Sequence, residues 1–278
     1  MLKEIAIADA YGAGFEFSTE EKIKQYNDLS KYQPHDLYGF IGRYTDDTQM
    51  SIAIAQLLLS NSTWTQTQIA QAFIDCFQRD PRKGYSKGFY TLLSNVKNAE
   101  ELIEVIRPNS ERNGAAMRAV PLGVIKDLEA LIYAATQQAK VTHNSEVGIN
   151  SSCAVALAAH FGLYKKGTLT ELKSFLIDQG YGDWNYSWTG SVDMNAHNTV
   201  SAAFSCLFSS QDLKNLLKKC VSLGGDTDSV SAIAVGLASC YEQYNLNLPA
   251  NLIQDLDEPK YGLHYLTELD KKLILMVG

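Results

Sequence analysis

The chain has 278 residues, of which 46% are hydrophobic and 20% charged, with 19 glycines and 6 prolines. This composition is typical of a packed globular protein and excludes a disordered or collagen-like chain. Acidic residues outnumber Lys and Arg by 31 to 24, a net charge of −7, and no basic stretch stands out. Non-specific binding to nucleic acid is therefore not expected, because it depends on clustered cations.

The N-terminal segment does not resemble a signal peptide, because Asp9 interrupts its apolar residues. The longest apolar runs, such as residues 154–164, are about half the roughly 20 residues that a membrane span requires. We therefore expect a cytoplasmic protein without membrane contact. The cysteines lie within apolar helical patterns and are odd in number, which predicts buried free thiols rather than disulfides or metal ligands: Cys76, Cys153, Cys206, Cys220 and Cys240.

Apolar residues recur at helical spacing in nearly every segment, and no clear alternation of apolar and polar residues predicts a strand. The periodic segments are residues 52–59, 69–77, 128–139, 154–164, 169–177, 200–208, 213–223, 230–244 and 261–275. The breaks between them are short and contain helix stop and start signals. The sequence therefore predicts an all-α fold of roughly a dozen helices in one domain, residues 1–278.

Residues 180–191 differ from the other breaks because they are rich in aromatic residues and glycine. Two interpretations remain open for these rings. They either fill the core beneath a loop or form a wall over a ligand. The rings that could form such a wall are Trp184, Tyr186 and Trp188.

The first acidic element lies near the N-terminus. Asp9 interrupts an otherwise apolar helix, which is costly unless the charge is paired or functional. Small residues at positions 10 and 12–14 permit a close approach of another helix. Glu16 is expected at the end of the same helix, where an acid opposes the helix dipole. We interpret Glu16 as either a catalytic or metal-linked residue or a solvated surface acid.

The second acidic element precedes the helix that begins near residue 46. Thr45 is placed to cap this helix, and Asp46 and Asp47 fall in its first turn. Capping and the helix dipole alone account for such a pattern, because each acid in a first turn contributes about 0.3–1 kcal/mol.

The third acidic element follows Gly224 and Gly225, which permit a sharp turn before the helix that begins near residue 230. Asp226, Asp228 and Ser229 surround the start of that helix. Two carboxylates and a hydroxyl at each of two helix starts exceed what capping requires. If both helices enter one cleft, four carboxylates converge there and repel one another unless cations neutralise them.

The chemistry of these ligands favours a hard cation. Carboxylate and hydroxyl oxygens select Mg²⁺, Mn²⁺ or Ca²⁺ over Zn²⁺, because neither cysteine nor a pair of histidines accompanies them. Two ions suit four carboxylates better than one.

These elements resemble the ADP-ribosylglycohydrolase family, which includes dinitrogenase-reductase-activating glycohydrolases and ADP-ribosylarginine hydrolases. The resemblance covers most of the chain and rests on Asp9–Gly12 with Glu16, Thr45–Thr48, Asn113–Arg118, Thr142 with His143, and Gly224–Ser229. It implies an all-α, compact orthogonal multi-helix domain of that family's type. Ser229 stands where the family usually has Thr, which keeps a hydroxyl at the position.

The resemblance also implies a site with two Mg²⁺ or Mn²⁺ ions. Carried over position by position, the metal ligands are Thr45, Asp46, Asp47, Asp226, Asp228 and Ser229. Glu16 is the leading candidate for the general base, with Asp46 or Asp47 as its rival. The expected activity is hydrolysis of the bond between ADP-ribose and an acceptor, with a modified protein side chain such as ADP-ribosyl-arginine favoured.

Three further segments are expected to bind the substrate. Asn113, Gly114 and Ala115 resemble the family's diphosphate cradle, in which small residues expose backbone N–H groups at a helix start. The loop formed by Gly84, Tyr85 and Ser86 matches a family loop that could close over ribose or diphosphate. His143 is either a hydrogen-bond donor to the same groups or a structural histidine whose hydrogen bonds are satisfied within the protein.

Two other functions compete with this one. An aspartate-rich prenyl-transfer enzyme needs acids one helical turn apart, but Met50 occupies the position that would complete that motif after Asp46 and Asp47. A non-catalytic ADP-ribose binder or crystallin-like relative would retain the fold. Against it stand the four intact aspartates, since a degenerate site would be expected to lose metal carboxylates first.

Overall fold

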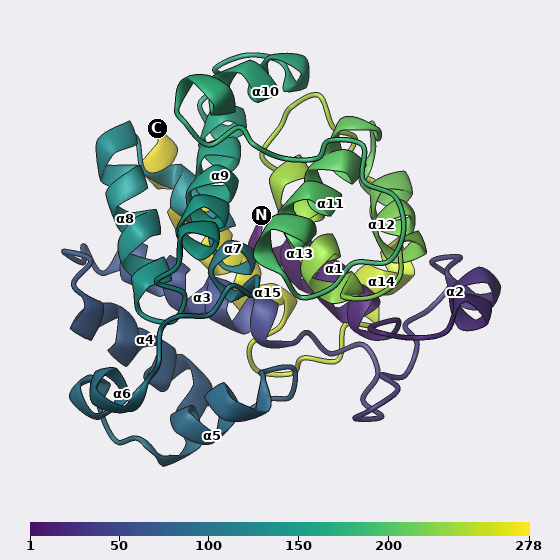
Figure 1. Ribbon diagram of the computed structural model, residues 1–278. Coiled ribbons are helices and arrows are strands. Elements are labelled where there is room, and N and C mark those ends of the chain that lie inside the picture. Colours follow the sequence, from purple (N-terminus) through teal and green to yellow (C-terminus); the bar gives the residue numbers. More distant parts are fainter.

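The computed structural model describes residues 1–278 as an array of helices joined by short loops (Figure 1). It contains no sheet, only isolated bridges between single residues. The helices are α1 (Leu2–Ala13), α2 (Glu20–Tyr26), α3 (Asp46–Leu59), α4 (Gln66–Gln78), α5 (Lys87–Asn95), α6 (Ala99–Val105), α7 (Gly114–Met117), the 3₁₀ helix η1 (Val120–Val124), α8 (Leu128–Lys140), α9 (Glu146–Leu163), α10 (Leu169–Asp178), α11 (Ala196–Phe208), α12 (Leu213–Ser222), α13 (Thr227–Ala238), α14 (Ala250–Gln254) and α15 (Leu263–Val277). The all-α prediction is confirmed.

Helices α1 and α13 pack against each other in the middle of the molecule, although they come from opposite ends of the sequence. Both are buried on nearly every side, which explains why their sequences are apolar almost throughout. Small residues let the two backbones approach closely. A Cβ atom on Gly12 would lie 2.6 Å from the Cα atom of Asp228. This contact brings the acidic segment of α1 next to the start of α13.

The other helices surround this pair. Helices α9, α11 and α12 pack on α13, and α3 packs on α1 and α4. The buried apolar side chains form one cluster of 80 residues. All five cysteines are buried and free, as predicted. No helix is both long and apolar enough to cross a membrane.

The aromatic segment at residues 180–191 packs on α11. The Trp184 ring meets Phe204 edge to face at 6.0 Å, and Tyr186 stacks on the same ring at 5.9 Å. The Trp184 indole N–H donates to the Tyr181 carbonyl at 2.6 Å. Of the two interpretations of this segment, these contacts favour core filling beneath a loop.

Candidate active site

Asp9 of α1 lies at the start of α3 and accepts hydrogen bonds from it. The backbone N–H groups of Thr45 and Thr48 donate to its carboxylate at 3.0 Å, and their hydroxyls lie 2.8 and 2.6 Å from it. Thr45 occupies the N-cap position, but its side chain makes no capping hydrogen bond. The cap of α3 therefore comes from a different helix, which pairs the charge of Asp9 with the donors at that helix end.

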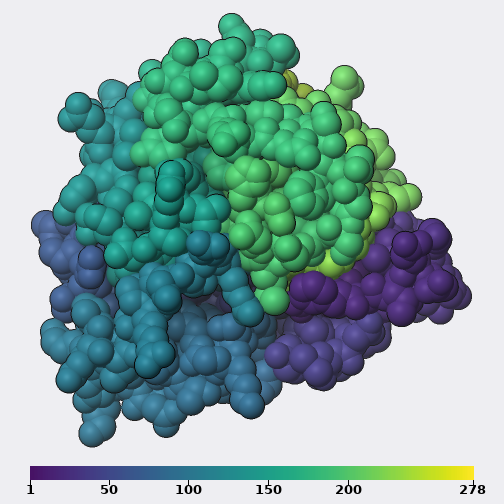
Figure 2. Space-filling model, viewed as in Figure 1, coloured from purple at the N-terminus to yellow at the C-terminus, as the bar shows by residue number.

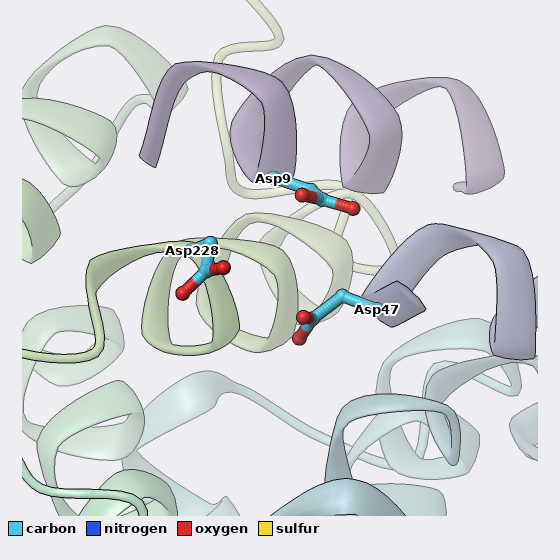
Figure 3. Close-up of side chains that lie close together, drawn as sticks. All are labelled: Asp9, Asp47 and Asp228. Carbon is cyan, nitrogen blue, oxygen red and sulfur yellow. The ribbon is translucent and has the colours of Figure 1, made fainter. Parts of the chain in front are cut away.

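Asp47 and Asp228 face Asp9 across the junction of three helices (Figure 3). One ligand atom from each of the three carboxylates lies within 4.8 Å of the other two. All three residues are buried, and the Oδ1 atom of Asp47 has no hydrogen-bond partner. An unpartnered carboxylate oxygen beside two other buried carboxylates fits a divalent cation, which supplies the missing positive charge.

A second acidic group adjoins the first and consists of Glu16, Asp226 and Asp228, again with ligand atoms within 4.8 Å of one another. Asp226 begins α13 after two glycines in the left-handed region, Gly224 at φ +75° and Gly225 at φ +79°. A Cβ atom on Gly225 would lie 2.0 Å from the carbonyl oxygen of Val192, so only glycine fits there.

Glu16 lies in the turn that follows α1, three residues beyond its last residue, Ala13. The sequence placed it at the end of the helix itself. Its carboxylate is partly exposed and is held by the buried ring of His35, whose Nε2 atom lies 2.8 Å from Oε2.

Burial shifts the protonation of the whole cluster. It raises the pKa of Asp9 to about 6, even though the four donors on Asp9 oppose that shift. Burial, followed by the charge of Asp9, raises the pKa values of Asp46 and Asp47 well above their usual range. The pKa values of Asp226 and Asp228 are raised by burial as well. Without a cation the cluster therefore favours bound protons, which is the expected response of crowded buried acids.

A cavity of about 510 Å³ opens onto both acidic groups. Segments far apart in the sequence line it, and the blue, teal and green parts of the chain meet on that face of the molecule (Figure 2). Of the sequence-predicted site residues, all but two line this cavity: Glu16, Asp46, Asp47, Gly84, Tyr85, Ser86, Asn113, Gly114, His143, Asp226, Asp228 and Ser229. The exceptions, Thr45 and Ala115, are fully buried beside it.

The loop of Gly84, Tyr85 and Ser86 closes one wall of the cavity next to Asp46. Gly84 has φ +114°, and a Cβ atom on it would lie 2.4 Å from Oδ1 of Asp46. Tyr85 is buried and donates its hydroxyl to Oε1 of Gln49 at 2.6 Å. The Ser86 hydroxyl accepts from Phe89 N–H as the N-cap of α5. Of the three, Gly84 lies nearest the acidic cluster, and the side chains of the other two are engaged in structural hydrogen bonds.

The Asn113 segment joins the acidic end of the cavity to its far end. The Asn113 amide donates to Oδ2 of Asp226 at 2.6 Å and to the Thr199 hydroxyl at 3.1 Å. The next residue, Gly114, packs against the His143 ring, since a Cβ atom there would lie 2.7 Å from Cε1. Asn113 therefore holds a carboxylate, and Gly114 leaves room for an imidazole.

His143 is a neutral hydrogen-bond donor whose tautomer is fixed by its neighbours. Arg118 donates to the Thr142 hydroxyl at 2.7 Å, and the one acceptor within reach of that hydroxyl's own proton is Nδ1 of His143, 2.6 Å away. Burial, together with the charges of Arg118 and Arg112, lowers the pKa of His143 to about 3. The single ring proton is therefore on Nε2.

Sequence reasoning missed several residues of this cavity. Arg107 and Arg112 are exposed and line it, as do the apolar side chains of Phe89, Leu92, Val105, Ile106, Met117 and Met194. None of Trp184, Tyr186 and Trp188 reaches it. No local signal marked these residues, because their meeting depends on how α5, α6 and α7 are arranged around the acidic cluster.

Comparison with known proteins identifies the class that this fold and site define. The sequence model of the ADP-ribosylglycohydrolase family matches residues 5–277, so the chain belongs to that family. A solved structure described as an ADP-ribosylglycohydrolase-related protein complex superposes with a TM-score of 0.76 and 21% identity, covering 99% of this chain and 95% of its own. The resemblance stated from the sequence is therefore confirmed.

Three relatives illustrate the range of the family. The chain is 25% identical to ADP-ribosyl-[dinitrogen reductase] glycohydrolase of Rhodospirillum rubrum, over 91% of this chain and 87% of the relative. It is 25% identical to ADP-ribosylhydrolase ARH3 of Xenopus tropicalis, over 94% and 92%. It is 24% identical to ADP-ribosylarginine hydrolase Tri1 of Pseudomonas putida, over 84% and 67%.

Proposed function

We propose that this protein is a metal-dependent hydrolase that cleaves the glycosidic bond between ADP-ribose and a protein side chain, with ADP-ribosyl-arginine as the first candidate. One observation carries the proposal. Aspartates at the starts of two helices, α3 and α13, the partly exposed Glu16 and the donor His143 open onto one cavity of about 510 Å³. The names of the relatives from R. rubrum and P. putida, which specify a protein and arginine, support this class of acceptor.

Two divalent cations, Mg²⁺ or Mn²⁺, fit the donor set of this cluster. The proposed ligands are those named from the sequence: Thr45, Asp46, Asp47, Asp226, Asp228 and Ser229. Support comes from the unpartnered Oδ1 of Asp47 and from the all-oxygen chemistry of the group. When bound, the cations neutralise the carboxylates, orient the ribose hydroxyls and stabilise negative charge on oxygen. Asp9, whose carboxylate is engaged by Thr45 and Thr48, holds the start of α3 in place for them.

Glu16 is the proposed general base. Its carboxylate adjoins Asp226 and Asp228, lines the cavity and is partly exposed, whereas the carboxylates of Asp47, Asp226 and Asp228 are buried. Glu16 would accept a proton from the attacking water as the water oxygen bonds to the anomeric carbon and the bond to the acceptor breaks. Carboxylates nearby favour the oxocarbenium-like transition state of such a cleavage.

The far end of the cavity is the proposed site for the rest of ADP-ribose. Nε2–H of His143 and the first N–H groups of α7, at Gly114 and Ala115, are donors for the diphosphate. The loop of Gly84, Tyr85 and Ser86 would cover the ribose. The adenine would lie against the apolar side chains of this cavity rather than against residues 180–191.

The activity is tested by incubating the protein and Mg²⁺ or Mn²⁺ with ADP-ribosylated arginine, ADP-ribosylated serine and ADP-ribosylated DNA, and by measuring free ADP-ribose. Release from the arginine conjugate, abolished by a chelator and restored by the metal, is expected. Full turnover after exhaustive chelation would contradict the metal-dependent mechanism. ADP-ribose binding without release from any substrate would favour the non-catalytic alternative.

The role of Glu16 is tested by Glu16→Gln, which keeps the size and hydrogen-bonding capacity of the side chain. Turnover is expected to fall roughly 10²- to 10⁴-fold, the usual contribution of a positioned base. ADP-ribose affinity, measured by calorimetry on the same preparation, should change by less than several fold. Near-normal turnover would assign the base to Asp46 or Asp47. A joint loss of ligand and metal affinity would make Glu16 a metal ligand.

A further inference from the structure

A tight turn between α2 and α3 places His35 beside Glu16. The His35 N–H donates to the Phe40 carbonyl at 2.9 Å, and Gly39 N–H donates back to the His35 carbonyl at 2.8 Å. Gly39 lies in the left-handed region at φ +72°, which lets the chain reverse there. The rings of Tyr38 and Phe40 lie 4.7 and 4.9 Å from the imidazole, which is buried.

The hydrogen bonds of the His35 ring fix where its proton is. Nδ1 accepts the backbone N–H of Leu37 at 3.1 Å, so it carries no hydrogen itself. The one hydrogen of the neutral ring is therefore on Nε2, which lies 2.8 Å from Oε2 of Glu16. His35 thus donates Nε2–H to the Glu16 carboxylate.

Glu16 depends on this donor for its orientation. It lies in a turn rather than in a helix, and its neighbour Phe17 has φ +47°. His35 makes the only side-chain hydrogen bond to the Glu16 carboxylate. Because that bond is made at Oε2, the other carboxylate oxygen, Oε1, is free to interact with a molecule in the cavity. A glutamate side chain without such an anchor would rotate among its staggered conformers.

Resting on the proposed role of Glu16 as the base, we infer that His35 is a positioning residue for this reaction. It holds Oε2 of Glu16 so that Oε1 faces the attacking water. His35 does not relay the proton further, because its other nitrogen is occupied by a backbone donor that leads to no acceptor. Neither is it a metal ligand, since both ring nitrogens are already engaged.

The inference is tested with two substitutions that separate the hydrogen bond from the packing. His35→Phe keeps a ring between Tyr38 and Phe40 but removes the donor, whereas His35→Gln keeps an N–H donor of similar reach. In His35→Phe, kcat should fall roughly 10- to 100-fold, the effect of about 1 Å of misplacement at a reacting group. KM and the Kd of ADP-ribose should change by less than about threefold. His35→Gln should regain at least about fivefold of the lost kcat.

A double-mutant comparison separates this role from a general loss of structure. In the Glu16→Gln background, His35→Phe should cause no further loss of kcat, because the group that it positions is already inactive. His264→Phe, an exposed histidine on α15, is the matched control and should leave kcat unchanged. If His35→Phe does not fold, as judged by circular dichroism, His35→Met fills the same space with a flexible side chain.

Three results would overturn the inference: normal kcat in His35→Phe or His35→Met, an equal loss in His35→Gln, or an undiminished loss in the Glu16→Gln background. A failure of the proposed function is distinguishable from these, because the unsubstituted protein would then release no ADP-ribose. A failure of Glu16 as the base would leave Glu16→Gln active. An inactive Glu16→Gln with a fully active His35→Phe refutes only the role of His35.

Discussion

Removal of divalent cations should make the stability of this protein fall as the pH rises above about 4. The reason lies in the buried carboxylates, among them Asp9, Asp47 and Asp228, whose pKa values are raised by burial. A carboxyl group with a higher pKa in the folded state binds more protons when folded than when unfolded. The free energy of unfolding therefore decreases with pH between the unfolded and the folded pKa values.

Asp9 sets the scale of this effect. Its side chain is fully buried, and its pKa is raised from 3.8 to about 6. Two pKa units correspond to a contribution of about 3 kcal/mol to the free energy of unfolding. This contribution is present below a pH of about 4 and is lost by a pH of about 6. The other aspartates whose pKa values are raised act in the same direction.

The ion pair between Glu4 and the N-terminal ammonium has the opposite dependence on pH. Although burial opposes it, the ammonium lowers the pKa of Glu4 to about 2, so the stability from this ion pair is lost in acid.

The assay is urea unfolding at a series of pH values from 4 to 8, in a chelator and then in saturating Mg²⁺ or Mn²⁺. In the chelator, the free energy of unfolding should reach its maximum near the acidic end and fall by about 3 kcal/mol or more towards pH 8. The metal should remove most of this fall. Asp178→Asn, which neutralises an exposed acid on α10, is the control and should leave the slope unchanged. A flat or rising profile in the chelator would refute the reasoning.

Three further substitutions test separate parts of the site. Asp228→Asn should abolish turnover and leave the melting temperature of the metal-free protein unchanged or raised, and a large destabilisation would instead mean that this acid mainly holds a helix end. Thr142→Val should weaken ADP-ribose binding by about 2- to 12-fold in calorimetry, because Nδ1 of His143 loses its hydrogen-bond partner and one hydrogen bond contributes about that much. Thr142→Ser keeps the hydroxyl and should leave the affinity unchanged. Gly84→Ala should weaken Mn²⁺ binding in titration calorimetry, because its Cβ atom would overlap Asp46, and unchanged affinity would show that the loop can shift.

The sequence predicted most of the helices, because their apolar residues repeat with the helical period and this repeat is a local property of the sequence. It also indicated that four carboxylates would converge if the helices beginning near residues 46 and 230 entered one cleft, since the number of acids exceeded what capping needs. It did not predict that Asp9 caps α3, because that depends on how α1 crosses the start of another helix. Thr45 was an adequate local cap, and nothing in the neighbouring sequence indicated that a distant acid would replace it.

The supporting residues were harder to predict than the acids. His35 reaches Glu16 only because a turn closed by Gly39 folds back on the end of α1. Arg118 was visible as part of a motif, but its contact with Thr142 joins α7 to the end of α8, two elements that the sequence does not place side by side. Such partners belong to tertiary structure, whereas helical period and capping chemistry are local properties.

The energies at the acidic cluster support the proposal that cations bind there. Helices α3 and α13 both begin at the cluster, and a helix start favours a nearby anion by about 0.3–1 kcal/mol. The roughly 3 kcal/mol that ionised Asp9 costs at neutral pH remains although the donors at the start of α3 already lower its pKa, so the helix starts do not offset it. A cation at 100 times its Kd, bound only to the folded state, adds about 2.7 kcal/mol and also cancels the repulsion. In the proposed site, the two helix ends would orient the carboxylates, and bound cations would make the ionised cluster stable at neutral pH.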